Sequence, residues 1–319
     1  LNSYDELLRP VSMWARDIGS EDLTLRHHVV YGEGHPSAVA DNFMGRPWKN
    51  YDEAGMVEIG EYDYKGQPLY KIRKVIKDSE ILSTMPTSIY RVDWGVLDDS
   101  DLEGSYRTDM QYDALGRPVE ITLPMDVNSG RKIIEPVYNR AGAMTAIKLD
   151  TEEYVSRIAY NARGQRILVA YDHPSLNSPF MTRYAYDPVN FRLLRQKTED
   201  YAATGLTFAP QSGSTRQDCT YLYDLAGNIV GMTDKSASDC GIGGAGTLDR
   251  EFGYDALYRL VYATGREAGL YASSSSPWTE AHIPTGGSGN AATDTHDYYR
   301  TYTYDKLGNM LDLYHYGNS

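Results

Sequence analysis

The sequence predicts an all-β protein built as a meander of hairpins with little helix, and three observations support this prediction. The chain of 319 residues contains 28 Tyr and only 5 Phe. Tyr is a good strand former, and its ring can pack on a sheet while its hydroxyl stays near water. The pattern Tyr-(Asp/Asn)-x-x-Gly occurs seven times, and alternate residues such as Thr108, Met110 and Tyr112 precede one copy. Alternation with a period of two is typical of strands.

The repeated motif has the chemistry of a hairpin turn. Asp or Asn at the start of a type I turn accepts hydrogen bonds from the backbone two residues on, and Gly is least strained at the positive-φ position of a three-residue hairpin loop. Each copy is therefore expected at a hairpin tip. The candidate site residues are these turn formers: Tyr51, Asp52, Gly55, Tyr62, Asp63, Gly66, Tyr112, Asp113, Gly116, Tyr138, Asn139, Gly142, Tyr160, Asn161, Gly164, Tyr223, Asp224, Gly227, Tyr304, Asp305 and Gly308.

Three degenerate copies keep the Tyr-Asp pair and lose the glycine, at Tyr4, Tyr186 and Tyr254. Runs rich in β-branched and aromatic residues follow several turns, as in residues 167–171 and 260–263. The spacing between copies is irregular, which favours a meander with inserted loops over a solenoid of fixed period.

The repeat continues along the chain and predicts a single domain over residues 1–319. Three polar segments rich in Gly and Ser are expected as long loops within it, at residues 204–218, 234–248 and 271–295. Cys219 and Cys240 flank one predicted hairpin. A disulfide between them requires the loop to fold back, so the sequence leaves both the bonded and the free state open.

Composition excludes several classes of partner. The formal net charge of −13 opposes binding to nucleic acid. No run approaches the 18–20 apolar residues that a transmembrane helix needs, and no leader-like pattern follows Leu1.

Other motifs carry little chemistry, so no metal and no cofactor are expected. Residues 241–246 match Gly-x-Gly-x-x-Gly without the strand and helix that a dinucleotide site requires. Residues 98–104 resemble the start of an EF-hand loop, but Met110 stands where Glu is needed, which leaves a solvated acidic turn or an irregular Ca²⁺ site. The seven histidines show no metal-ligand spacing. The basic run at residues 71–77 is interpreted as a solvated strand face, with an anionic glycan or membrane surface as the alternative.

With these motifs, the sequence resembles the YD-repeat, or RHS-repeat, proteins of bacterial toxins and animal teneurins. Residues 42–57, 254–267 and 300–305 sharpen the resemblance toward the RHS-repeat region of the C component of Tc insecticidal toxin complexes. The resemblance covers residues 31–319.

The resemblance implies a curved strip of hairpins that forms part of a spiral hollow shell around a C-terminal effector. The implied partners are the remainder of the shell, the enclosed effector, and the B component and channel component of a Tc complex. It also implies a secreted toxin. The family's autoproteolytic closing segment, with its Asp-Pro motif, is not visible in the sequence. No residue of this chain is therefore assigned a catalytic role, and the chain is not expected to be an enzyme.

Two other functions remain open. The first is a carbohydrate-binding or protein-binding adhesion module, in which exposed tyrosine rings recognise a surface glycan or another protein. The second is a glycan-active enzyme, which would need two carboxylates about 5–10 Å apart. The regular placement of the repeat aspartates at turn starts already has a structural cause.

Overall fold

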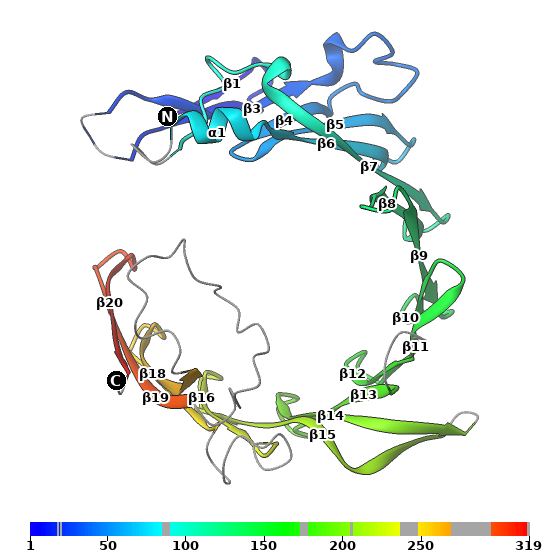
Figure 1. Ribbon diagram of the computed structural model, residues 1–319, viewed down its shortest axis with the longest axis vertical. Coiled ribbons are helices and arrows are strands. Elements are labelled where there is room, and N and C mark those ends of the chain that lie inside the picture. The colour runs from blue at the N-terminus through cyan, green and yellow to red at the C-terminus, as the bar shows by residue number, and fades with distance from the viewer. Residues whose placement is uncertain are drawn as a thin grey trace. The chain divides into compact units, whose positions relative to one another are not determined.

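The computed structural model describes residues 1–17, 19, 21–84, 90–172, 178–204, 207–236, 248–268 and 295–317. The chain divides into two compact units, Leu1–Glu152 and Glu153–Ser319. Within each unit the strands pair antiparallel with their successors along the chain (Figure 1). The prediction of an all-β meander of hairpins with little helix is therefore confirmed. The prediction of a single domain stays a prediction.

In its described residues the first unit contains ten strands, one short helix and two 3₁₀ turns. Its elements are β1 (Asn2–Tyr4), β2 (Pro10–Ala15), β3 (Thr24–Tyr31), η1 (Gly32–Gly34), β4 (Pro47–Asp52), β5 (Gly55–Tyr62), β6 (Pro68–Ile76), α1 (Asp78–Thr84), η2 (Asp99–Asp101), β7 (Leu102–Tyr112), β8 (Pro118–Met125), β9 (Arg131–Tyr138) and β10 (Met144–Leu149).

The second unit continues the meander with strands alone in its described part. Its strands are β11 (Glu152–Tyr160), β12 (Arg166–Tyr171), β13 (Phe180–Tyr186), β14 (Leu193–Thr204), β15 (Thr207–Tyr223), β16 (Ile229–Asp234), β17 (Arg250–Tyr254), β18 (Leu260–Ala268), β19 (Thr295–Tyr304) and β20 (Met310–Gly317).

The turns of each unit lie alternately at two edges of its sheet, because successive strands run in opposite directions. We call the edge with the turns that follow odd-numbered strands the repeat edge. Every odd-numbered strand ends in tyrosine: Tyr4, Tyr31, Tyr62, Tyr112, Tyr138, Tyr160, Tyr186, Tyr223, Tyr254 and Tyr304. Hairpins with their tips on one edge therefore account for the recurrence of the Tyr motif.

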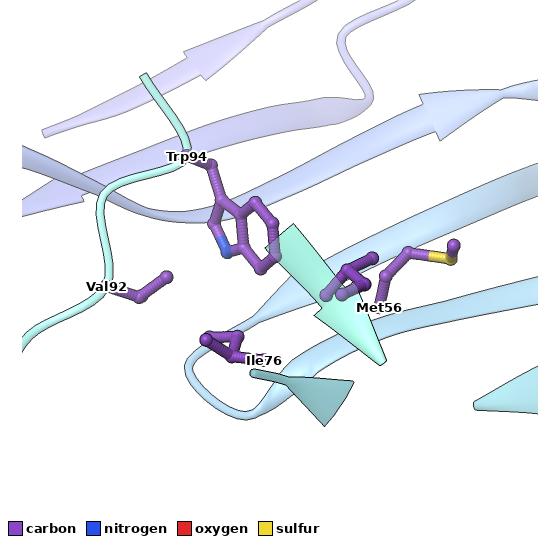
Figure 2. Close-up of a cluster of buried hydrophobic side chains, with 5 residues drawn as sticks. Met56, Ile76, Val92 and Trp94 are labelled. Carbon is purple, nitrogen blue, oxygen red and sulfur yellow. The ribbon is translucent and has the colours of Figure 1, made fainter. Parts of the chain in front are cut away.

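The segment between β6 and β7 covers one face of the first unit. It contains α1 and η2, and its Val92 and Trp94 pack on Met56 of β5 and Ile76 of β6 (Figure 2). Backbone bonds also anchor it, since the Trp94 N–H donates to the carbonyl of Leu25 on β3 at 3.0 Å. We call the described residues of this segment, 78–84 and 90–101, the cap. Local pattern did not predict it, because its helix is only seven residues long.

Apart from this cluster, the sheets bury few hydrophobic side chains. Among the described residues, 16 hydrophobic side chains are buried. The strands in substantial contact are consecutive ones, so the strands pair side by side instead of stacking as two sheets. In the second unit Met181, Ala170 and Tyr201 form a buried group, with Phe208 packed against it. Most stabilisation must therefore come from contacts within the single layer.

The predicted loop at residues 204–218 is wrong. The structure places residues 207–218 in β15, which pairs with β14 from Thr204↔Thr207 to Arg195↔Thr220. The Gly and Ser residues that indicated a loop instead accompany register shifts in this long hairpin, where Gly213 has φ +75°. Residues 237–247 and 269–294, which make up most of the other two predicted loops, lie outside the described residues.

Cys219 is buried on β15 and has no disulfide partner among the described residues. Burial, followed by the neighbouring Asp234 carboxylate, raises the pKa of this thiol to about 11. Cys240 lies outside the described residues, so the question of a disulfide stays where the sequence left it.

The repeat edge as the candidate functional site

Six of the seven predicted Gly-containing turns lie on the repeat edge and share one geometry. In the turn after β5, the Asp63 N–H donates to the Gln67 carbonyl at 2.8 Å and the Gly66 N–H donates to the Asp63 carbonyl at 3.0 Å. Asp63 Oδ1 accepts from the N–H groups of Lys65 and Gln67, both at 2.8 Å. The carboxylate therefore accepts hydrogen bonds from backbone N–H groups that have no partner strand within the turn.

The glycine of these turns has a positive φ. The values are 86° at Gly66, 81° at Gly116, 83° at Gly142, 79° at Gly164, 108° at Gly227 and 93° at Gly308. L side chains rarely adopt this region, which explains the glycine in the motif.

The degenerate copies keep the turn without the glycine. Leu8, Phe191 and Tyr258 take positive φ values of 60°, 63° and 62° at the corresponding place. Asp5 and Asp255 still accept the backbone amides of the second and fourth residues on, as Asp63 does. The turn after Asp187 is one residue longer, because the Asp187 N–H donates to Arg192 instead of to the fourth residue on. The aspartate thus determines the turn more strongly than the glycine does.

The Tyr51 copy differs from the expected three-residue loop. It joins β4 to β5 on the opposite edge, and Asp52 pairs with Gly55 across a two-residue turn. Gly55 has φ +139°, and a Cβ there would lie 2.2 Å from the Lys74 carbonyl oxygen. Tyr51 donates its hydroxyl to Asp99 at 2.8 Å. The Tyr51 copy therefore has the same motif residues as the other copies but forms a different turn, because the strand before it runs in the opposite direction.

Eight tyrosine hydroxyls each connect a hairpin to the one before it. The acceptor in each bond is the backbone carbonyl of the first residue of the preceding even-numbered strand. The bonds are Tyr31 to Pro10 (3.1 Å), Tyr62 to Pro47 (2.8 Å), Tyr112 to Pro68 (3.0 Å), Tyr138 to Pro118 (3.0 Å), Tyr186 to Arg166 (2.9 Å), Tyr223 to Leu193 (2.9 Å), Tyr254 to Ile229 (2.9 Å) and Tyr304 to Leu260 (2.8 Å). We call this set of bonds the tyrosine ladder.

Tyr31 is a member of the tyrosine ladder that sequence reasoning missed. No Asp follows it, and residues 32–46 form a longer connection to β4. Its ring lies under the Arg9 guanidinium, with 3.9 Å from Cζ to the ring centroid. The signal that could have found it is the strand that ends in tyrosine, independent of the turn residues.

A second set of bonds joins neighbouring tips. The residue that follows the turn glycine reaches to the next hairpin: the Gln67 side-chain amide donates to the Gly116 carbonyl at 2.7 Å, and Gln165 donates to Phe191 at 2.9 Å. In other repeats an arginine has this place. Arg259 donates to the Asp305 carbonyl at 2.8 Å and stacks on the Tyr304 ring at 4.9 Å.

The electrostatics of the edge follow from these contacts. Backbone and side-chain hydrogen bonds from Arg117 lower the pKa of Asp113, and those from Asn309 lower the pKa of Asp305. Burial raises the pKa of the Tyr112 and Tyr223 hydroxyls. A general acid needs a raised carboxyl pKa, so Asp113 and Asp305 are suited to accept hydrogen bonds and not to act as general acids.

The remaining sequence motifs fall away from this edge or outside the described residues. Asp98 and Asp101 form a capping box on η2, which gives the acidic run a structural cause. Within the described ranges no cluster of His, Cys, Asp and Glu could hold a metal ion. Arg73, in the basic run, pairs with Asp52 through two contacts of 2.7 Å. The Gly-rich residues 241–246 are not among those described.

Comparison with known proteins finds relatives that are toxin subunits. No protein-family model matches the chain. Toxin subunit YenC2 of Yersinia entomophaga is 26% identical over 315 residues, and toxin subunit YenC1 of the same organism is 30% identical over 323 residues. The alignments cover 96% and 98% of this chain but 30% of each relative. The chain thus spans less than a third of the length of these curated relatives.

Solved structures share the fold. The crystal structure of TcdB2-TccC3 matches with a TM-score of 0.62 and 20% identity, over 99% of this chain and 14% of that chain. The Photorhabdus luminescens Tc holotoxin pore, with a TccC3 D651A mutation, matches with a TM-score of 0.62 and 21% identity over the same shares. In the described residues, no helix has the length and apolarity to cross a membrane.

Proposed function

Because the chain belongs to the YD-repeat, or RHS-repeat, family and its relatives are toxin subunits, we propose that it forms part of the wall of a shell around the effector of a secreted bacterial toxin. The wall keeps the enclosed domain apart from its surroundings. The first partners are then the remainder of the shell and the effector. The B component and the channel component of a Tc complex are the outer partners, and the place of action is extracellular.

The observation that carries this proposal is a sheet whose strands expose side chains on both faces. In β7 the consecutive residues 103–107 are exposed, and in β20 every residue of Met310–Gly317 is exposed. Because successive residues of a strand point to opposite faces, both faces of these strands are open to water. A sheet in a globular domain usually buries one face, whereas a wall between two aqueous spaces must tolerate water on both.

The repeat edge supplies what such a wall needs in place of a core. The tyrosine ladder ties each tip to the preceding hairpin, and the arginine and glutamine bridges tie it to the next. The wall is then held by many small contacts along its length. Individual hydrogen bonds of this kind contribute about 0.5–1.5 kcal/mol each.

Limited proteolysis of the complete protein tests the proposal. The expected result is that a C-terminal effector survives protease while the shell is intact. In a variant that combines Tyr112→Phe, Tyr138→Phe and Gly116→Val, the effector should be cut at least tenfold faster. Tyr64→Phe is the control, since Tyr64 is exposed and outside the tyrosine ladder. An effector cut equally fast in all three proteins contradicts the wall function.

One observation favours adhesion as a second candidate. The Tyr262, Tyr299 and Tyr316 rings lie in a row across β18–β20, with centroids 5.9 and 6.3 Å apart. Tyr299 and Tyr316 are 43% and 57% exposed, which leaves ring surface for stacking on sugars. A glycan array with the 319-residue chain and a Tyr299→Ala variant tests this candidate. Signal that disappears in the variant supports adhesion, and an empty array removes it.

A further inference from the structure

Exposed apolar side chains form a row along the repeat edge of the second unit. The turns that follow β13, β15, β17 and β19 present Val189, Leu225, Leu257 and Leu307, and each of these side chains is at least 67% exposed. Turns usually hold polar or small residues at such places. The first unit repeats the feature with Leu7 and Leu115. A single exposed leucine is ordinary, but a set that recurs at the middle of successive turns indicates a contact surface.

Neighbouring tips of this row are bonded to each other, so the row is continuous. Arg192 donates to the Asp224 carbonyl at 2.8 Å, and Arg259 donates to the Asp305 carbonyl at 2.8 Å. The hydroxyl of Tyr254, a member of the tyrosine ladder, joins the middle pair of hairpins. Consecutive tips are separated by two strand spacings, about 9.5 Å. The four apolar side chains therefore follow one another at a nearly constant interval.

The charged groups of the row nearly balance. Its four turns contain the aspartates Asp187, Asp224, Asp255 and Asp305, and its tips hold the cations Arg163, Arg192, Arg259 and Lys306. Arg259 forms an ion pair with Asp255 at 2.7 Å, and Arg163 reaches from the preceding turn to the ring of Phe191. An anionic partner finds no excess of positive charge there. The row is therefore suited to an apolar contact.

A second run of the same repeat matches the row in spacing. The strand spacing sets the interval between its tips too, so apolar contacts can continue from one tip to the next. A helical partner repeats one face about every 10.5 Å and falls out of step along the row. A membrane would have to take up the charged side chains that lie between the tips. Spacing and charge thus favour a partner made of hairpins.

We propose that this row docks on another run of hairpins of the same repeat, in a part of the complete protein outside these 319 residues, and closes the edge of the wall there. The proposal rests on the wall function, because a single-layer wall needs a seal along the edges where its strands turn. Apolar side chains that leave water at the contact stabilise such a seal. The curated relatives contain enough chain for a second run, since the alignments cover 30% of each.

Cysteine labelling of the complete protein tests whether the row is covered. Leu225→Cys and Leu307→Cys each place a thiol at a tip. Asp312→Cys and Leu313→Cys are the controls, since these exposed neighbours on β20 point to opposite faces of the sheet. We expect maleimide to label the tip variants at least tenfold more slowly than the faster control, after subtraction of the wild-type signal. Tips labelled as fast as that control overturn the proposal.

The same variants separate the seal from the wall function. If only the seal is wrong, the tips are labelled rapidly while the effector stays protected from protease. If only the wall function is wrong, the effector is cut rapidly while the tips stay slow. Far-UV circular dichroism confirms that each variant is folded.

Photo-crosslinking identifies what covers the row. With the photo-crosslinker p-benzoylphenylalanine in place of Leu225, we expect mass spectrometry to find crosslinks to hairpin peptides of the same molecule, outside these 319 residues. Crosslinks to a second molecule, which disappear on dilution, would instead make the row an interface between copies. Tips that become protected from maleimide only when lipid vesicles are added would assign the row to a membrane. Either result overturns the proposal.

Discussion

At the scale of single residues, phenylalanine could not replace the tyrosines at the strand ends, because it lacks the hydroxyl that forms their hydrogen bonds. Eight hydroxyls of the tyrosine ladder each meet a backbone carbonyl at a strand start, in 2.8–3.1 Å bonds. Those carbonyls lie beside a turn, where the strand ladder is interrupted. The excess of Tyr over Phe in the composition therefore reflects a specific bond, as well as the packing of rings on a sheet.

Loss of one hydroxyl should be measurable. We expect Tyr112→Phe to reduce the free energy of unfolding by about 1 kcal/mol, because the Pro68 carbonyl loses its donor. Urea unfolding followed by circular dichroism measures the change. Tyr64→Phe, at a side chain 77% exposed, should leave the midpoint unchanged. Equal effects at both positions would mean that the hydrogen bond contributes nothing.

The turn glycines can be tested where only backbone strain changes. Gly164 has φ +79°, and a Cβ built there meets nothing within 4 Å. Gly164→Val should therefore cost about 1–3 kcal/mol from strain alone, while Gly164→Asn should cost less, since Asn tolerates this conformation. Thermal unfolding of both variants measures the order. A valine variant as stable as the wild type would refute the strain argument.

The turn carboxylates predict the response to acid. A carboxyl group whose pKa is lowered in the folded state contributes stability that is present above its unfolded pKa, near 3.8, and is lost as the pH falls through the folded value. Asp305→Asn removes this titration but keeps an oxygen for the Leu307 and Asn309 amides, as Asn139 and Asn161 do in their repeats. The variant should lose less stability than the wild type between pH 5 and pH 2 in an acid titration followed by tyrosine fluorescence. A steeper loss in the variant would contradict this.

At the scale of elements, the sequence located most of the turns but could not assign their edges. The turns after Asp63, Asp113 and Asp224 follow from local chemistry, since aspartate and glycine determine them within five residues. The Tyr51 copy has the same motif but lies on the other edge, because the edge depends on how many strands precede the turn. The local sequence therefore predicts where a turn occurs, and the number of preceding strands determines at which edge of the sheet it lies.

Two other elements were beyond local reasoning for different reasons. Residues 207–218 have the composition of a loop, and β14 makes them a strand by pairing with them. The cap, in its described residues 78–84 and 90–101, is held by Trp94 and Val92 against β5 and β6. Tertiary contacts decide both, and one sequence does not display those contacts. For the candidate site, the turn residues were predictable, while Tyr31 and the bonds between hairpins were not.

The cap should contribute stability through burial. Met56 is fully buried beneath it, so Met56→Ala should lower the free energy of unfolding by about 2–5 kcal/mol, through lost burial and the cavity left behind. Met44→Ala is the matched control, since this side chain is 55% exposed and should cost little. Urea midpoints give both values. Equal costs at the two sites would mean that the cap does not seal the cluster.

At the scale of the whole molecule, the small number of buried side chains sets the thermodynamics. The described part of the chain contains only 16 buried hydrophobic residues. Unfolding should therefore expose less new surface than in a compact protein of this length, and the denaturant m-value scales with that surface. We expect a urea m-value clearly below that of globular proteins of similar size. An m-value typical of a compact core would contradict the single-layer description.

The tyrosine ladder also has a consequence for the order in which the hairpins can fold during synthesis. Each hydroxyl reaches backward along the sequence, across separations that range from 15 residues between Tyr62 and Pro47 to 44 residues between Tyr112 and Pro68. A hairpin that leaves the ribosome therefore finds its acceptor already synthesised, and no bond of this set waits for a later segment. Short sequence separations favour fast folding, and domains form from the N-terminus during translation. The architecture can thus be laid down one hairpin at a time, in the order of synthesis.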